Sequence, residues 1–283
     1  MTRTGPLWLV ANGASGSNDH AALDRLIEAL RVVGNQPALV IDCQTDELPD
    51  RAALERNDVT TLAIFTGDGT ANTAITSVEG WDGEVLLLPG GTANLLAKAL
   101  HGECSAEEIV AAFGAGRLRA TTRNCIRSSQ GSALVEVLAG PGATWSEVRE
   151  GLREGDIGGT ASKAVEAVRQ SATGPMVIIA EPVLGRDSGY AGVRLAPEAS
   201  GMSVDGYGAE TVADYLKQGI ALLKRDFREG PHDELGTHSE VLCRSADGSP
   251  IALMIDGERR SGGGEEHFSL AQLGVNLLGT PDG

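Results

Sequence analysis

The amino-acid sequence predicts an α/β fold joined to an all-β fold, and three features of the 283-residue chain support this prediction. In the first 120 residues, short apolar runs alternate with stretches of helical periodicity, an order typical of α/β domains. After Gly116, short β-type runs are separated by Gly, Pro, Ser and Asp, which indicates a mainly antiparallel domain. Glycine accounts for 38 residues, close to twice its usual share of about 7%, and several of these glycines follow predicted strands.

Four strands predicted in the first domain have almost unbroken rather than alternating apolar stretches, which favours strands buried on both faces of a parallel sheet. They cover residues 6–11, 37–41, 61–65 and 84–88. Helices are expected between and after them, where apolar residues recur at helical spacing: Leu23, Leu26, Ile27, Leu30 and Val33, then residues 71–78, 93–100 and 106–113. This order predicts a doubly wound domain, which we assign to residues 1–122.

The second domain is assigned to residues 123–283, and we leave open that its C-terminal tail returns to the first domain. Strands are predicted at residues 132–138, 176–180, 190–195, 239–244 and 251–255. One amphipathic helix interrupts them, with an apolar face that runs from Val212 to Phe227.

Composition and charge exclude several functional classes. Hydrophobic residues make up 41% of the chain, yet no apolar run approaches the roughly 20 residues that a membrane-spanning helix needs. With no secretory leader in its first residues, the chain is expected to be cytoplasmic. The net charge of −16 opposes sequence-independent binding to nucleic acid, so an anionic partner must be met by a local site.

Three glycine-containing loops stand directly after predicted strands, at residues 11–18, 66–70 and 89–94. In α/β sheets the ligand crevice lies at this end of the strands, and the first N–H groups of the following helix attract phosphate. Asp68 lies between two glycines, where its carboxylate could face phosphates only across a divalent cation or a transferable proton. Such a placement of Asp68 is the geometry of a kinase, although each loop taken alone is more often just a strand-ending turn.

In order and spacing, the loops resemble the catalytic domain of the diacylglycerol kinase family, which includes sphingosine and ceramide kinases. Residues 12–16 match the family's Asn-Pro-x-(Ser/Ala)-Gly segment, and residues 66–70 match its GGDGT segment. The Pro-x-Gly-Thr-x-Asn motif is intact over residues 89–94, and residues 256–258 match the Asp-Gly-Glu segment near the end of these kinases. The resemblance implies a phosphofructokinase- and NAD-kinase-like nucleotide domain followed by a C-terminal antiparallel β-sandwich.

The resemblance also assigns roles to individual residues. Asp68 would serve Mg-ATP and Glu258 would be the proton acceptor, although the residues alone leave open which of the two is the base. Asp205 is a candidate ligand of a structural magnesium ion that some relatives hold. The implied ATP contacts are Asn12, Ser15, Gly16, Thr45, Gly67, Gly69, Thr70, Gly91, Thr92 and Asn94.

The sequence departs from the family pattern at four positions. Gly13 replaces a proline and Thr66 a glycine, which changes loop stiffness without removing the central donors. Leu95 and Asn124 stand where many relatives have an aspartate, so fewer carboxylates are available for metal binding.

The predicted function is therefore an ATP- and Mg²⁺-dependent lipid kinase that phosphorylates a hydroxyl of a diacylglycerol-like or sphingoid lipid. Substrate would be met in a transient peripheral contact with the membrane, for which the basic residues between Lys217 and Arg228 are a candidate surface. A homodimer is left open. The alternatives are an NAD kinase-like enzyme and a nucleotide-binding regulator that has lost phosphotransfer.

Overall fold

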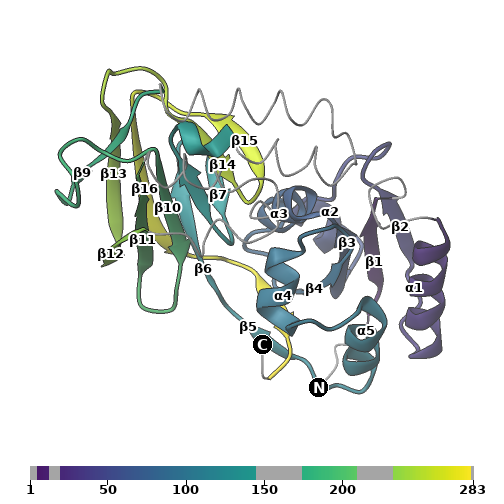
Figure 1. The fold of residues 1–283 in the computed structure, drawn as a ribbon. Helices are drawn as coiled ribbons and strands as arrows, with labels where there is room; N and C mark the ends of the chain where they lie inside the picture. The colour runs from purple at the N-terminus through teal and green to yellow at the C-terminus, as the bar shows by residue number, and fades with distance from the viewer. Residues whose placement is uncertain (1–4, 13–19, 145–173, 209–231, 282–283) are drawn as a thin grey trace. The chain divides into compact units, whose positions relative to one another are not determined.

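The computed structural model describes residues 5–12, 20–144, 174–208 and 232–281 (Figure 1). The chain divides into two compact units. The first combines Met1–Arg123 with Gln272–Gly283, and the second is Asn124–Ala271. The amphipathic helix predicted between Val212 and Phe227, with its basic residues, lies outside the described residues. No helix within the described ranges is long and apolar enough to cross a membrane.

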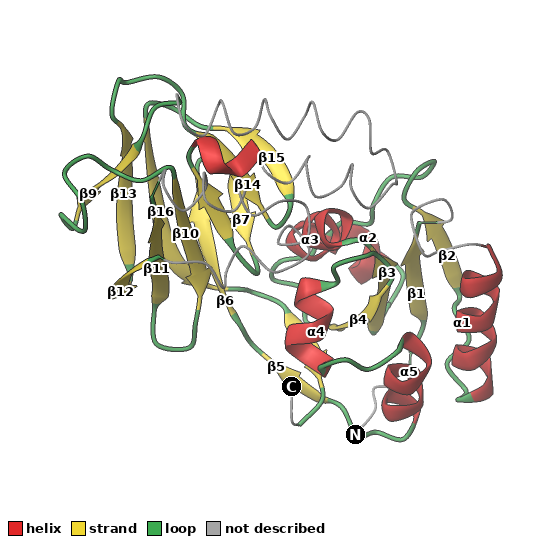
Figure 2. Cartoon of the chain, in the orientation of Figure 1, coloured by secondary structure: helices red, strands yellow, loops and turns green. Residues whose placement is uncertain are grey.

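The first unit is built on a six-stranded sheet with the order β2-β1-β3-β4-β17-β5. Its strands are β1 (Leu7–Ala11), β2 (Leu39–Asp42), β3 (Thr61–Thr66), β4 (Glu84–Pro89), β5 (Arg119–Thr121) and β17 (Asn276–Gly279). Its helices are α1 (His20–Val32), α2 (Arg51–Arg56), α3 (Asp68–Ser77), α4 (Leu95–His101) and α5 (Ala106–Gly114), drawn in red in Figure 2. Only the β17–β5 pair is antiparallel.

Both faces of the central strands are buried, as expected for a doubly wound sheet. Leu9, Phe65 and Leu88 belong to a core cluster with residues of α1 and α5, while the alternate residues Ile64 and Leu87 are also buried. The four predicted strands and the four predicted helices of this unit all exist, with ends shifted by a few residues. The α/β part of the predicted fold class is therefore confirmed.

The prediction that β2 is buried on both faces is wrong. Leu39 and Val40 are 43% and 39% exposed, because β2 lies at the edge of the sheet and pairs only with β1. An apolar run of this length does not distinguish an edge strand from a central one.

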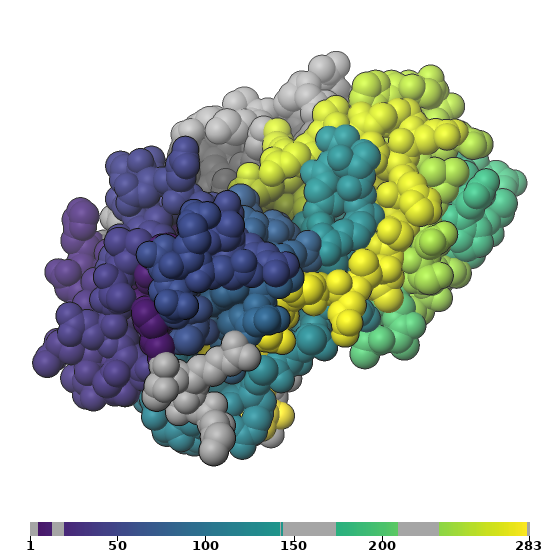
Figure 3. Space-filling model, turned by 180° about the vertical axis from the view of Figure 1, so that it is seen from behind, coloured from purple at the N-terminus to yellow at the C-terminus, as the bar shows by residue number. Residues whose placement is uncertain are grey.

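Three elements of the first unit, α2, β5 and β17, were not predicted from the sequence as separate elements. Helix α2 has six residues and is capped by Asp50, whose Oδ1 accepts the Ala53 N–H at 2.7 Å. Strand β17 comes from the C-terminal end of the chain and pairs parallel to β4. Figure 3 shows these C-terminal residues, in yellow, against the blue residues of the first unit. Such short elements depend on tertiary neighbours more than on their own periodicity.

The second unit consists of two antiparallel sheets, which enclose one apolar core that includes Ile126, Val193 and Phe268. One sheet has the order β12-β11-β10-β8-β14-β15 and the other β7-β6-β16-β13-β9. This arrangement confirms the all-β part of the fold class. The strands are β6 (Asn124–Ser128), β7 (Gly131–Ala133), β8 (Val137–Ala139), β9 (Val177–Glu181), β10 (Gly192–Pro197), β11 (Met202–Tyr207), β12 (Asp233–His238), β13 (Glu240–Ser245), β14 (Ala252–Ile255), β15 (Glu258–Ser261) and β16 (Glu265–Gln272), with a 3₁₀ turn at Pro141–Thr144.

The single strand expected at residues 132–138 is instead two strands, β7 and β8, which lie in different sheets. The three residues between them, 134–136, donate their backbone N–H groups to the carboxylate of Asp256. Because these N–H groups are committed to a side chain, they cannot continue a sheet ladder, and the strand breaks.

His101, at the C-terminal end of α4, is expected to make the first unit less stable in mild acid. Its side chain is 3% exposed, neither ring nitrogen has a hydrogen bond of good geometry, and burial lowers its pKa from 6.5 to about 4. The unfolded chain gains the proton near pH 6.5, so stability is lost as pH falls from there towards 4, by about 2 kcal/mol between pH 7 and pH 5. Urea unfolding of the wild type at both pH values measures this loss. His101→Met should lack it, whereas the exposed His267→Gln should keep it, and an equal loss in His101→Met would contradict the assignment.

Candidate active site

The strand order places a switch point between β1 and β3, because β2 lies on one side of β1 and the later strands lie on the other. Ligands of open α/β sheets bind outside the carboxyl ends of the strands at such a point. Ala11 pairs with Phe65, and Phe65 pairs with Leu88, so these strands end at similar levels. The loops that begin after β1, β3 and β4 therefore start side by side, as the sequence predicts. Of the loop after β1, Ser15 and Gly16 lie outside the described residues, and Asn12 is its described end.

The loops after β3 and β4 pack so closely that two glycines are needed for steric reasons. A Cβ at Gly90 would lie 2.5 Å from the backbone of Phe65 and Thr66, and one at Gly91 would lie 2.6 Å from the Cα of Gly67. Contacts this short do not occur in folded proteins, so larger residues there would push the loops apart. Gly91, a predicted ATP contact, thus has a structural role as well.

Asn94 braces the same loop through its side chain. It adopts a left-handed conformation with φ of 52°, which asparagine tolerates better than most residues. Its Oδ1 accepts the Gly91 N–H at 2.7 Å, and its Nδ2 donates to the Gly91 carbonyl at 2.9 Å. Both ends of the amide are thereby engaged within the loop, which fixes the start of α4.

Gly67 differs from its neighbours, because nothing in the described structure requires a glycine at this position. Its φ and ψ of −75° and 166° are accessible to any residue. A Cβ there would have one described neighbour within 4 Å, the Cα of Gly91 at 3.9 Å. Among the described residues, the absence of a side chain at position 67 therefore leaves room beside the first turn of α3.

Helix α3 begins at Gly67 without a side-chain cap, whereas α2 is capped by Asp50 and α5 by Ser105. The first N–H groups of a helix have no partner within the helix, and the helix dipole adds partial positive charge there. An uncapped helix start beside an open glycine can bind an anionic oxygen. Gly69 and Thr70 lie in this first turn.

Asp68 is the first residue of α3, but its carboxylate lies at the start of α4. Its Oδ1 accepts the Leu96 N–H at 3.4 Å. Burial raises the pKa of this carboxyl group above its usual value, and the N–H groups of Leu96, Leu95 and Asn94 oppose that shift. Asp68 thus links the two glycine loops and keeps a partly buried negative charge beside them.

The three threonines predicted to contact ATP, Thr45, Thr70 and Thr92, lie in segments that follow three different strands of the first sheet. Thr70 is part of α3 and hydrogen-bonds the thiol of Cys43, which opposes the rise that burial causes in the pKa of that thiol. Thr45 is exposed in the turn after β2, where its N–H donates to the Asp42 carbonyl at 3.1 Å. Thr92 is exposed in the loop after β4.

In the second unit, Glu258 follows a two-residue hairpin turn between β14 and β15. The turn residues Asp256 and Gly257 have φ values of 47° and 87°, as a type I′ turn requires. Glu258 is exposed and pairs across the hairpin with Ile255. Within the described part of the chain its carboxylate has no charged partner, so it is available to a ligand.

Asp256 is a site residue that the sequence analysis did not single out, although it stands in the same motif. Its side chain is 3% exposed, and its carboxylate accepts three backbone N–H groups, from Leu134 at 2.7 Å, Val135 at 3.0 Å and Glu136 at 2.9 Å. An Asp-Gly pair predicts the turn but does not show that the carboxylate points inward.

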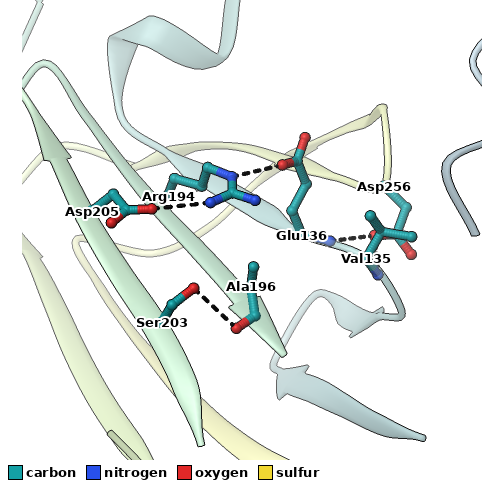
Figure 4. Close-up of polar contacts among 7 residues, drawn as sticks. All are labelled: Val135, Glu136, Arg194, Ala196, Ser203, Asp205 and Asp256. Atoms are coloured by element: carbon teal, nitrogen blue, oxygen red, sulfur yellow. Dashed lines mark hydrogen bonds and ion pairs between the residues drawn. The ribbon is translucent and has the colours of Figure 1, made fainter. Parts of the chain in front are cut away.

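Asp205, the candidate magnesium ligand, lies on β11 in an ion pair. Arg194 donates from Nη1 to Asp205 at 2.9 Å and from Nε to Glu136 at 2.8 Å (Figure 4). No group of three or more His, Cys, Asp or Glu side chains in the described ranges could hold a metal ion. Arg194 donates to one oxygen of each carboxylate, so Asp205 is already engaged in an ion pair, and its role as a magnesium ligand stays a prediction.

Proteins of known structure share this fold. A diacylglycerol kinase from Bacillus anthracis strain Sterne has the same fold, with a TM-score of 0.61, 11% sequence identity and 98% coverage of both chains. A second protein of that strain, described as a candidate diacylglycerol kinase, is similar with a TM-score of 0.63 and 14% identity over 100% of this chain and 99% of its own. No curated protein matches the chain significantly by sequence.

Residues 6–123 match the model of the diacylglycerol kinase catalytic domain. This part of the chain is therefore similar to the diacylglycerol kinase catalytic domain. The family resemblance expected from the three loops is confirmed.

Proposed function

We propose that the protein is an ATP-dependent lipid kinase that transfers the γ-phosphoryl group to a hydroxyl of a diacylglycerol-like or sphingoid lipid. The observation that carries the proposal is the uncapped start of α3 beside Gly67, at the switch point of the sheet. This arrangement offers backbone donors and space to a phosphate chain without a cationic side chain. The match of residues 6–123 to the diacylglycerol kinase catalytic domain supports a lipid as the acceptor.

In this proposal, the residues of the first unit mainly position and neutralise the triphosphate. The N–H groups at the start of α3 bind phosphate oxygens, and the rigid loop around Asn94 fixes the neighbouring wall. Mg²⁺, when bound, would neutralise charge on the transferring group, and Asp68 is the carboxylate that fits it. The contact of Asp68 with α4 holds that carboxylate in place beforehand.

Glu258 is the proposed proton acceptor. Its carboxylate is exposed at the end of a rigid turn, so it can approach a hydroxyl group without first breaking an ion pair. As the bond from the acceptor oxygen to the γ-phosphorus forms, the bond from that phosphorus to the oxygen bridging the β-phosphate would break, and ADP would leave. The acceptor hydroxyl would lose its proton to the Glu258 carboxylate. The acyl chains would supply the binding energy that holds the hydroxyl there.

The proposal is tested by incubating the full chain with labelled ATP, Mg²⁺ and an extracted lipid mixture, and then identifying the species that gains phosphate. A labelled lipid is expected. Label on NAD would support the NAD kinase-like alternative. Binding of ATP without any transfer in a single turnover would support a nucleotide-binding regulator, and either result would contradict the proposal.

Gly67→Ser is expected to weaken ATP binding without weakening the fold. Serine is a preferred helix-capping residue, so its hydroxyl should bind the N–H groups at the start of α3 and stabilise the helix by a few tenths of a kcal/mol. The same N–H groups would then be lost to phosphate, and ATP affinity should fall by roughly 10-fold, or about 1.4 kcal/mol. Calorimetric titration with ATP and urea unfolding measure the two effects.

Gly91→Ala is the comparison variant, which shows the effect of crowding the same two loops. Its Cβ would lie 2.6 Å from the Cα of Gly67. It should lower the free energy of unfolding by about 1–3 kcal/mol, the usual cost of overpacking. If Gly67→Ser binds ATP with the affinity of the wild type, the phosphate does not lie at the start of α3.

A further inference from the structure

A continuous chain of polar contacts in the second unit ends at the turn that carries Glu258. It runs from Asp205 through Arg194 to the carboxylate of Glu136, and the backbone N–H of Glu136 donates to Asp256 at 2.9 Å. Figure 4 shows Arg194 between the two carboxylates and the Asp256 carboxylate facing the backbone of residues 135 and 136. Asp256 is also the first residue of the turn, two positions before Glu258.

The contacts join three strands that are otherwise held together only by the sheet. Glu136 lies just before β8, Arg194 on β10 and Asp205 on β11, while the backbone N–H of Asp256 donates to the Glu136 carbonyl at 3.0 Å. The link between the 134–136 segment and the hairpin turn is thus made in both directions. The Asp256 end of the turn therefore cannot shift without breaking several hydrogen bonds.

Such a network is costly to bury, which argues for a role other than stability alone. The side chains of Arg194, Glu136 and Asp205 are only 22%, 12% and 15% exposed. Burial alone would lower the pKa of Arg194, but Glu136 and Asp205 reverse this and hold it above its usual value. Buried ion pairs of this kind are often no more stabilising than apolar residues of equal volume, but they define a geometry sharply.

We propose that Asp256, together with the Asp205–Arg194–Glu136 brace, positions Glu258 for proton transfer. The inference rests on the proposed function. Asp256, Arg194 and Glu136 are positioning residues that act through Glu258, and an internal arginine supplies the positive charge that holds the brace together. Because a general base must lie within hydrogen-bonding reach of its proton, a shift of the turn by about 1 Å should cost roughly 10²-fold in rate.

Asp256→Asn is the sharpest variant. Asparagine tolerates the left-handed conformation and keeps the turn, and its oxygen can still accept the N–H groups of Val135 and Glu136. Its amide nitrogen, however, would face the Leu134 N–H, which the carboxylate accepts at 2.7 Å. Two donors then oppose each other, and the turn should move away from residues 134–136. We expect kcat for lipid phosphorylation to fall roughly 10²-fold, with the KM for ATP unchanged.

Glu136→Gln tests the brace more gently, since the amide oxygen can still accept from Arg194 but the charge is lost. Asp233→Asn is the matched control, because Asp233 forms an ion pair with Arg186 at 2.8 Å in the same unit and lies on β12, outside the Asp205–Arg194–Glu136 contacts. Glu136→Gln should lower kcat, whereas Asp233→Asn should keep the kcat of the wild type. Thermal unfolding of every variant separates a loss of rate from a loss of folded protein.

A double-mutant cycle with Glu258→Gln decides whether Asp256 acts through Glu258. If it does, Asp256→Asn should cause little further loss of rate in the Glu258→Gln protein. A normal kcat for Asp256→Asn, or losses that multiply in the double variant, would overturn the inference while leaving the proposed function intact. A wild-type protein that phosphorylates no lipid, or a fully active Glu258→Gln, would instead overturn the proposed function, and the inference with it.

Discussion

Glu258→Gln is expected to abolish most lipid phosphorylation while leaving ATP binding unchanged. The side chain is exposed, follows a rigid turn and has no charged partner in the described ranges, so the substitution disturbs no contact of the fold. Glutamine keeps the size of the side chain but cannot accept a proton. The rate of transfer should therefore fall roughly 10²- to 10⁴-fold, the effect typical of removing a general base.

The measurement is a single-turnover reaction with labelled ATP and the lipid identified from the extract, accompanied by calorimetric titration with ATP. Glu234→Gln serves as the control, since Glu234 is an exposed glutamate on β12 of the same unit. A normal rate with Glu258→Gln would show that Glu258 is only a turn residue, and Asp68 would become the leading candidate for the base.

The order of strands and helices in the first unit was predictable from the sequence. Buried parallel strands produce long apolar runs, which identify them as strands with little ambiguity. Strand β3 is buried at every position, and its run is read directly from the sequence. The exposed edge strand β2 and the C-terminal strand β17 differ from it in their neighbours rather than in their residues. Neighbours far along the chain are not encoded in local periodicity, so the exposure of Leu39 could not be foreseen.

The candidate site was predictable as a set of loops, but not as a set of separate roles. The glycine pattern located the loops after β3 and β4, yet only the structure separates Gly91, which close packing requires, from Gly67, which it does not. In the same way, the Asp-Gly-Glu segment predicted the hairpin, while the inward direction of Asp256 depends on residues 134–136, more than a hundred positions away. Close approaches and buried carboxylates arise from tertiary contacts that a linear motif does not contain.

Asp68→Asn is expected to impair the use of Mg-ATP with every acceptor, including slow transfer to water, by roughly 10²-fold, because a few kcal/mol of charge stabilisation is lost. The fold should not suffer. The amide oxygen of asparagine can still accept the Leu96 N–H, and burial raises the pKa of the Asp68 carboxyl group, so ionised Asp68 costs stability at neutral pH. The folded state binds the proton more readily than the unfolded chain, so the wild type gains stability as pH falls through this raised pKa.

The direction of this pH dependence can be checked by urea unfolding at two pH values. At pH 7, Asp68→Asn should be at least as stable to urea as the wild type, and the difference should shrink as the pH is lowered towards 4. The control is Asp50→Asn, because Asp50 also accepts a helix N–H, at 2.7 Å on α2, and asparagine is an equally good cap. That variant should keep full activity. If Asp68→Asn turns over Mg-ATP normally, the carboxylate serves only to join the two glycine loops, and its charge has no part in the reaction.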